Sequence, residues 1–256
     1  MSSATPDPEI QPKPANGIFV TAISDLHGHL PTISKTDLLL ISGDLCPIDN
    51  HAIGYQRKWL LNEFSAWARA LPTEQIMVIA GNHDFVFEQV DLRDELAAAG
   101  VTYLEDSSAD FHGWKVWGSP WVPNLQSWAF YSSDDDLAKR YSEIPDSVDI
   151  LLSHGPPLNW LDSISQPGGA LKYVGAPGLE ATIERISPAL VVCGHIHENY
   201  GARRLNSRET LLLNASQLDD AYQPAYVPIQ LWLERNKAGD QSRIVSPSFV
   251  QAQAEL

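Results

Sequence analysis

The sequence predicts an α/β domain in which buried strands alternate with helices. Five short apolar runs have the length and composition of buried strands, and they span residues 18–23, 38–41, 76–79, 150–152 and 190–193. Apolar residues at helical spacing lie between several of these runs, and each run ends at a cluster of polar residues. This alternation favours layered sheets that are covered by helices.

Residue spacing and end signals place the helices and the remaining strands. Between about 53 and 71, apolar residues form one helical face that ends before Pro72; they are Leu60, Phe64, Trp67 and Leu71. Further helices are predicted over about 92–99, where Gly100 supplies a C-terminal cap, and over about 179–186. Residues 199–205, 210–215 and 227–233 are expected to form antiparallel strands that complete the sheets.

A chain of 256 residues fits one large domain better than two small ones, and no repeat, linker or change of composition divides it. Residues 1–16 carry four prolines among polar residues, and we expect them to be a disordered tail. Residues 17–234 form the predicted domain, and residues 235–256 are expected to be a polar C-terminal tail.

The net charge disfavours several classes of function. Lysine and arginine together number 17 and aspartate and glutamate 32, which gives a formal charge of −15. Because such a chain repels polyanions, we expect neither a nucleic-acid polymer nor a membrane as a partner. No apolar run is long enough for a membrane helix, and no secretory signal is evident. Two cysteines, Cys46 and Cys193, suit a reducing compartment, so we expect a cytoplasmic protein.

Residues of the kinds that bind metals gather at the ends of the five apolar runs. In chain order they are Asp25 with His27, Asp44, Asn82 with His83, His154, and His195 with His197. Sites in α/β sheets form at the carboxyl ends of strands, where loops converge on a rigid frame. The mixture of imidazole nitrogen with carboxylate and amide oxygen suits first-row divalent metals better than calcium. The sequence therefore predicts a metal site assembled from five loops.

Two such ions would give this acidic chain the local positive charge that a phosphate needs. Two carboxylates contribute −2 against +4 from two divalent ions, which leaves about +2 at the centre. A carboxylate such as Asp44 can bridge two ions about 3.5–4 Å apart, and the pair lowers the pKa of a shared water for in-line attack on phosphorus. Manganese, iron, zinc and cobalt all accept such ligands, and the sequence does not choose among them.

Five sequence blocks resemble those of the calcineurin-like metallophosphoesterases in order and spacing, over about residues 18–234. They are Asp25-Leu-His27, Gly43-Asp44, Gly81-Asn-His-Asp84, Ser153-His-Gly155 and Gly194-His-Ile-His197. Four further segments resemble the metallophosphoesterase-domain-containing subgroup, which is related to class III cyclic-nucleotide phosphodiesterases: Gly118-Ser-Pro-Trp-Val-Pro123, His154-Gly-Pro-Pro157, His197-Glu-Asn-Tyr-Gly201 and Asn214-Ala-Ser216. The resemblance implies a four-layer α/β/β/α sandwich with two mixed sheets.

The resemblance also implies a role for each of these residues. One ion would be held by Asp25, His27 and His197, and the other by Asn82, His154 and His195, with Asp44 between the two. His83 would bind the phosphate and protonate the leaving oxygen, which is a general-acid role. Some mammalian members of the subgroup have glycine in place of the first histidine of the last block and are poor catalysts. This chain has His195 there, so a complete dinuclear site is expected.

The stretch after Asp44 departs from two related families. Pro47 stands where purple acid phosphatases have a metal-binding tyrosine, so no ferric–tyrosinate centre is expected. The arginine with which protein phosphatases grip a phosphomonoester is absent, and so is the carboxylate that orients their acid histidine. Asp49 or Asp84 could replace that carboxylate, and the sequence does not decide between them.

Other conspicuous residues have simpler interpretations. Surface or structural roles are expected for His29, His51, His112 and Cys46, and Cys193 is expected to be a small buried hydrophobe. Among the tryptophans, Trp121 is the best candidate for stacking on a nucleobase. Support of a turn or of the ligands is expected from Asn214 and Ser216, and Asp134-Asp-Asp136 is expected to begin a helix.

The leading hypothesis is a dinuclear metal-dependent phosphodiesterase that hydrolyses cyclic nucleotides or other small phosphodiesters. The missing arginine clamp favours diesters over monoesters. A phosphomonoesterase that acts on nucleotides or small metabolites is the alternative among enzymes, and a nucleotide-binding module with little turnover is the alternative outside them. Intact His83 and His195 count against the latter. The sequence does not indicate an oligomeric state.

Overall fold

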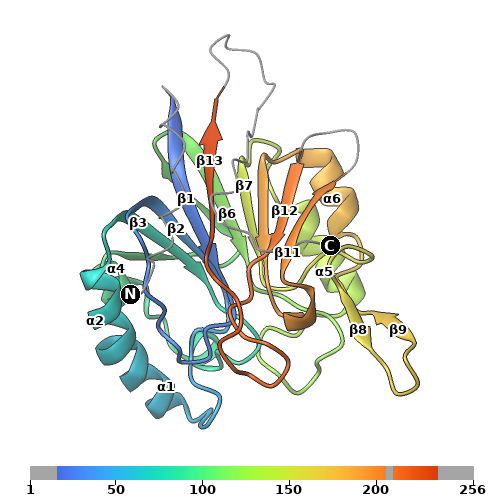
Figure 1. Ribbon diagram of the computed structural model, residues 1–256, viewed down its shortest axis with the longest axis horizontal. Helices are drawn as coiled ribbons and strands as arrows, with labels where there is room; N and C mark the ends of the chain where they lie inside the picture. The colour runs from blue at the N-terminus through green and yellow to red at the C-terminus, as the bar shows by residue number, and fades with distance from the viewer. Residues whose placement is uncertain (1–15, 206–209, 236–256) are drawn as a thin grey trace, which may run out of the picture.

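Two sheets form the centre of the molecule, and helices cover the outer face of each (Figure 1). The computed structural model describes residues 16–205 and 210–235. The first sheet has the order β13-β1-β2-β3-β4, in which β1 to β4 are parallel and β13 is antiparallel to β1. Its strands are β1 (Gly17–Ile23), β2 (Thr36–Ser42), β3 (Thr73–Ile79), β4 (Val101–Tyr103) and β13 (Ile229–Glu234).

The second sheet has the order β11-β12-β10-β7-β6-β5. Its four central strands are parallel, and an antiparallel strand closes each edge. The strands are β5 (Ser107–Phe111), β6 (Trp114–Ser119), β7 (Ile150–Ser153), β10 (Leu190–Cys193), β11 (Gly201–Leu205) and β12 (Thr210–Asn214). A separate hairpin of β8 (Ser163–Ser165) and β9 (Leu171–Tyr173) projects from the body (Figure 1).

Alternating side chains of each central strand enter two different cores, which accounts for the uninterrupted apolar runs. In β2, Leu38 and Leu40 lie between the two sheets, whereas Leu39 and Ile41 face the helices of the first sheet. In the second sheet, alternate residues of β10 divide in the same way between the central core and an outer core. Three cores therefore separate four layers, and the predicted α/β/β/α sandwich is confirmed.

The helices divide between the two outer faces. Against the first sheet lie α1 (Ile53–Trp59), η1 (Leu60–Phe64), α2 (Ser65–Ala70), α3 (Val86–Gln89) and α4 (Arg93–Ala97). Against the second lie α5 (Asp134–Ser142) and α6 (Leu179–Ile186), whose buried residues share a core with β7 and β10. The short 3₁₀ helix η2 (His197–Asn199) begins at one of the predicted metal ligands.

Several elements differ in detail from the sequence-based expectation. The helix expected over 53–71 is present, but its middle is a π-helical turn in which the Ser65 N–H donates to the Leu60 carbonyl, five residues earlier. The expected antiparallel pairing is present between β11 and β12 and between β13 and β1, but β12 also pairs in parallel with β10, because β11 runs against β10 and the hairpin after it reverses the chain again. Strands β4, β5 and β6 were not predicted, since their short runs mix polar with apolar residues. The acidic run at 134–136 begins α5, as expected, after a Ser133 cap.

The predicted tails, residues 1–16 and 235–256, lie almost wholly outside the described residues. Within the described ranges, no helix has both the length and the apolar character needed to cross a membrane.

Candidate metal centre

The five predicted loops converge at one end of the two sheets, the lower end in Figure 1. Each loop follows the carboxyl end of a parallel strand: β1, β2 and β3 in the first sheet, and β7 and β10 in the second. Backbone hydrogen bonds join neighbouring loops: the Asp25 N–H donates to the Gly43 carbonyl at 3.0 Å, and the Gly194 N–H to the His154 carbonyl at 2.9 Å. The strand ends thus form one rigid platform.

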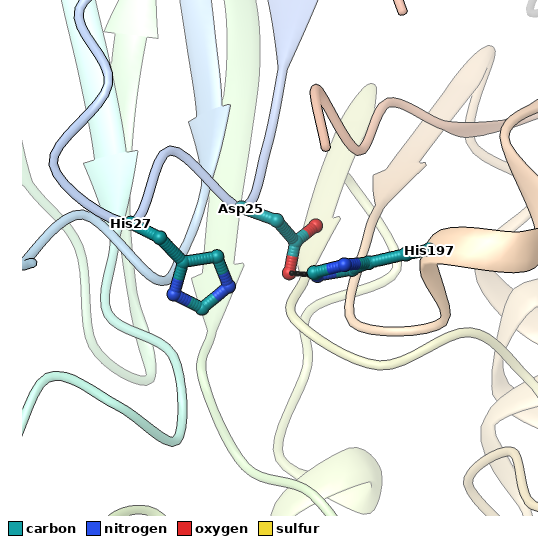
Figure 2. A group of neighbouring side chains, drawn as sticks. All are labelled: Asp25, His27 and His197. Carbon is teal, nitrogen blue, oxygen red and sulfur yellow. Dashed lines mark ion pairs between the residues drawn. The ribbon is translucent and has the colours of Figure 1, made fainter. Parts of the chain in front are cut away.

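Asp25, His27 and His197 form the first group of the site (Figure 2). One potential ligand atom from each lies within 4.8 Å of the others. The Nε2 atom of His197 lies 3.4 Å from the Asp25 carboxylate. Its Nδ1 atom lies 2.8 Å from the Asp219 carbonyl oxygen, which can only accept a hydrogen bond. Nδ1 is therefore the protonated nitrogen, and Nε2 is directed into the site.

Asp44 lies between the first group and the second. Its Oδ2 atom is 3.5 Å from His27 Nε2 and 3.4 Å from His154 Nε2. The His154 ring has the same arrangement as His197, because its Nδ1 donates to the Ser42 carbonyl at 2.8 Å. The Asn82 side-chain oxygen lies 3.0 Å from His154 Nε2. Asp44 thus lies within 3.5 Å of an imidazole nitrogen from each of the two predicted ligand sets.

His195 joins the centre through its backbone and its ring. Its N–H donates to both carboxylate oxygens of Asp25, at 3.0 and 2.9 Å. Its ring centroid is 5.0 Å from that of His154. The structure therefore brings all seven predicted ligands together: Asp25, His27, Asp44, Asn82, His154, His195 and His197.

Backbone strain is concentrated in the same loops. Four of these seven residues have a left-handed backbone, with φ of 54° at Asp25, 44° at His27, 52° at Asp44 and 66° at His195. Residues other than glycine rarely adopt this conformation, and it persists only where the surrounding structure enforces it. Its clustering here indicates that the loops are shaped to aim side chains at one point.

Two glycines permit the close approach of these loops. Gly194 lies against Asp25 and Ser24, so any Cβ at this position would overlap the Asp25 carboxylate. Gly43 has a φ of 102°, and a Cβ there would collide with the His154 ring and with the Ala80 carbonyl. Substitution of either residue would displace the site side chains themselves.

The charges of the site balance one another. Burial alone would raise the pKa of both carboxylates, but nearby histidines hold the pKa of Asp25 and of Asp44 well below the usual value. Burial alone would lower the pKa of His154 and His197, but the carboxylates raise each to about 9. At His27 and His195 burial prevails, and the pKa falls to about 4 and about 3.

These residues fit a metal centre. Both ring nitrogens of His27 are buried and lack a hydrogen-bond partner, although a carboxylate lies nearby. Buried polar atoms without partners are costly, and a cation held between the imidazole and the carboxylate would satisfy both. Metals bind ionised carboxylates and neutral imidazoles, the forms that the low pKa values of Asp25, Asp44, His27 and His195 favour, and a bound cation would displace a proton from His154 and His197. Three overlapping Asp–His groups, which together use Asp25, His27, Asp44, His83, His154 and His197, have this geometry.

The predicted acid His83 has an unexpected partner. Its Nδ1 atom lies 3.3 Å from Nε2 of His51. Neither carboxylate that the sequence offered contacts the ring. Asp84 accepts three backbone N–H groups, from Leu45, Cys46 and Gly81, and Asp49 accepts from the Tyr55 hydroxyl. His51, for which a surface or structural role was expected, therefore lies beside the predicted acid, because the loop that leads into α1 brings it to the site.

Aromatic rings surround His83. The Trp128 ring lies 4.4 Å from it, measured between centroids, and the Tyr222 ring lies 6.1 Å from it and 4.9 Å from His27. Tyr222 has a left-handed φ of 58°, so its backbone is strained as well. Trp128 is one of the tryptophans that the sequence offers for stacking, although Trp121 was preferred, and no sequence pattern predicted Tyr222. Both residues come from loops without a ligand motif. The loop that carries Tyr222 also supplies the carbonyl that orients His197.

The structure places Trp121 elsewhere. Its indole N–H donates to Asp106 at 2.8 Å, and the Arg140 guanidinium lies 3.5 Å from its ring centroid. Phe130 packs against it edge-on. Arg140 thus covers the ring that a nucleobase would need, and the recorded contacts of Trp121 do not include the site histidines. Trp128, not Trp121, is the tryptophan that touches His83.

Asn214 and Ser216 support the ligands, as expected. The Ser216 hydroxyl donates to Asp25 Oδ2 at 2.7 Å. The Asn214 amide donates to the Ile196 carbonyl at 2.8 Å and so fixes the loop between His195 and His197. Both cysteines are fully buried and unpaired.

Comparison with known proteins agrees with this geometry. The family model of the calcineurin-like phosphoesterases matches residues 20–199. This chain is a calcineurin-like phosphoesterase. Metallophosphoesterase domain-containing protein 1 of Homo sapiens is 31% identical over 251 residues, which cover 88% of this chain and 73% of that protein. Its Mus musculus counterpart has the same values. The crystal structure of TT1561 of Thermus thermophilus has a TM-score of 0.54 at 15% identity, covers 84% of this chain and 93% of its own, and so supports the fold.

Membership of the calcineurin-like phosphoesterases confirms two expectations. The chain is a metal-dependent phosphoester hydrolase, and its fold is the sandwich that the sequence resemblance implied. The fold of this family implies a dinuclear metal centre, and the Asp–His groups described above are where this phosphoesterase could hold one.

Proposed function

We propose that this phosphoesterase hydrolyses small phosphodiesters, with cyclic nucleotides or aryl phosphodiesters as the substrate class. One metal ion would be held by Asp25, His27 and His197, and the other by Asn82, His154 and His195, with Asp44 shared. Bound there, the ions would supply Lewis acidity toward the phosphoryl oxygens and an activated water. The metal could be manganese, iron, zinc or cobalt.

The observation that carries the preference for diesters is the nature of the charges around the site. Apart from burial, the pKa of Asp25 is set by His197, His154 and Asp44, and that of Asp44 by His154, His83 and His27, with no arginine or lysine among the leading influences. In the described part of the chain, arginines form their recorded ion pairs away from the centre, with Glu95, Asp91, Glu105, Asp106, Asp146 and Asp149. A phosphomonoester dianion would lack the cationic clamp it needs, whereas a diester carries one negative charge less.

His83 would act as the general acid. Its backbone N–H donates a 2.8 Å hydrogen bond to Asp44 Oδ1, which holds the residue beside the shared carboxylate. With Nδ1 directed toward His51, Nε2 is the nitrogen free to face the ester. Proton transfer from Nε2 to the leaving oxygen would prevent an alkoxide from forming, which contributes about 10²–10⁴-fold to such reactions.

Small substrates are favoured over polymers. The net charge of −15 repels a long polyanion, whereas a single phosphate group experiences mainly the local field of the centre. Trp128 and Tyr222 border His83, so a substrate with a planar group beside its phosphate would meet aromatic surface there.

The test is a substrate panel measured on protein that is stripped of metal and reloaded with one metal at a time. We expect kcat/KM for cyclic and aryl phosphodiesters to exceed that for the matching monoesters, and Asn82→Ala and His83→Ala to lower it. Faster hydrolysis of monoesters would establish the phosphomonoesterase instead. Tight nucleotide binding in calorimetry without turnover of any ester would establish a binding module and overturn the proposal.

A further inference from the structure

The main chain of His83 is held rigidly on both sides. Its N–H donates to Asp44, and its carbonyl accepts a 2.6 Å hydrogen bond from the amide of Gln56. Gln56 is fully buried, and its amide oxygen accepts in turn from the Val86 N–H at 3.0 Å. Rotation of the His83 side chain is therefore the freedom that remains to be fixed.

His51 supplies the polar contact that fixes this rotation. The 3.3 Å approach of its Nε2 to His83 Nδ1 is the one hydrogen-bond contact recorded for the His83 ring within the described residues. The other neighbours of the ring are aromatic faces and edges: His27 at 4.7 Å and Trp128 at 4.4 Å between centroids. Aromatic packing restricts the position of the ring, but it does not distinguish Nδ1 from Nε2.

His51 is itself held in place. Phe85 and Trp128 lie 5.2 and 5.5 Å from its ring centroid. The preceding residue, Asn50, accepts a hydrogen bond from the Ala52 N–H at 2.9 Å, immediately before α1 begins. The partner of the acid is thus anchored by packing and by the start of a helix.

We infer that His51 is a positioning residue for His83 and takes the place of the carboxylate that orients the acid histidine in protein phosphatases. The inference rests on the proposed acid role of His83. His51 presents a lone pair on Nε2 to the Nδ1–H of His83. This contact leaves the second N–H of the His83 imidazolium on Nε2, toward the ester.

The hydrogen bond between His83 Nδ1 and His51 Nε2 can persist throughout the proton transfer. When the bond between phosphorus and the leaving oxygen breaks, that oxygen takes the proton from Nε2, and the N–H electron pair stays on the imidazole of His83. Nδ1 keeps its proton and still donates to His51. His51 therefore gains and loses no proton, and its role is to fix orientation and tautomer.

The chain offers a matched pair of variants for the test. A glutamine amide reaches as far as Nε2 of histidine, whereas an asparagine amide reaches only as far as Nδ1. With the metal-loaded enzyme, we expect His51→Ala to lower kcat about 10- to 100-fold, the range typical of groups that orient a functional histidine by a hydrogen bond, with little change in KM. His51→Gln should restore most of this loss, and His51→Asn should not. His112→Ala, an exposed histidine far from the site, is the control.

Three further measurements distinguish loss of positioning from general damage to the site. The loss in His51→Ala should be larger for methyl phenyl phosphate than for methyl p-nitrophenyl phosphate, because p-nitrophenolate leaves with little protonation. The double variant His51→Ala/His83→Ala should be no slower than His83→Ala. In the zinc-loaded protein, ¹⁵N NMR of the imidazoles should show a fixed Nδ1–H tautomer for neutral His83 and a mixture in His51→Ala.

The outcomes distinguish this inference from the proposed function. If His83→Ala lowers kcat but His51→Ala does not, or if the two losses multiply, the inference alone is wrong. An unchanged NMR tautomer in His51→Ala also overturns it. If His83→Ala leaves kcat unchanged for both leaving groups, the acid role is wrong and the inference falls with it.

Discussion

At the carboxyl ends of the strands, His197 and Asp25 lie 3.4 Å apart, and at the opposite ends His112 and Glu74 lie 2.9 Å apart. The second pair is closer and borders a cavity of about 570 Å³. Its side chains are nevertheless 61% and 59% exposed, whereas those of the first pair are 9% and 0% exposed. Neither a short distance nor a large cavity therefore locates the chemistry of this protein.

The two ends differ in what surrounds each pair. Water can solvate His112 and Glu74, so their contact contributes little to stability and needs no further charged or polar partner. Asp25 and His197 lie among further buried carboxylates and imidazoles, and neither ring nitrogen of one of these, His27, has a hydrogen-bond partner. Their loops also have strained backbones. A functional site is indicated where burial leaves charges and polar atoms in need of an additional cation.

Of the variants that test this difference between the two ends of the sheets, Asp44→Ala is expected to have the largest effect on activity. Because Asp44 approaches both predicted ligand sets, its loss should cost several kcal/mol of transition-state stabilisation, or about 10³-fold in kcat/KM. Elemental analysis should find fewer than two ions per chain in the variant. Two tightly held ions and near-normal activity in Asp44→Ala would show that the centre is assembled in another way.

Removal of metal should have the next largest effect, on stability. Metal binding at 100 times its dissociation constant stabilises the folded state by about 2.7 kcal/mol, which corresponds to about 5–10 °C in Tm for a domain of this size. We expect calorimetry to show this loss after chelation and its recovery with manganese. Asp44→Ala is the control and should gain little from manganese. Equal gains in both proteins would place the stabilising ion outside the centre.

Sequence reasoning located the site because the loops that follow buried parallel strands must meet. Asp25, Asp44 and His154 follow such strands directly, so their position depended only on the fold class. His51 and Tyr222 lie several residues from any strand, in loops whose path depends on tertiary packing, and no spacing rule indicates where they return. The parallel pairing of β12 with β10 was not predicted either, because the composition of a strand does not show in which direction it runs beside a neighbour.

A smaller effect is expected at Ser216, which contacts a ligand without being one. Its hydroxyl donates to Asp25 at 2.7 Å, so Ser216→Ala should weaken metal affinity by about tenfold, the lower end of the range for groups that orient ligands. Metal titration followed by activity measures this shift. Ser65→Ala is a matched control, because Ser65 is also a buried serine but donates to the Leu60 carbonyl in the π-helical turn. It should lower stability and leave metal affinity unchanged.

The smallest effect is expected at the opposite end of the sheets. An exposed ion pair contributes about 0.2–1 kcal/mol, so Glu74→Gln and His112→Ala should each change Tm by no more than about 4 °C. Metal content and kcat/KM should not change, because neither residue lies near the buried carboxylates. A loss of bound metal in Glu74→Gln would mean that the exposed pair holds an ion after all. The distinction between the two ends would then rest on something other than burial, since the same two residue types would bind metal in both environments.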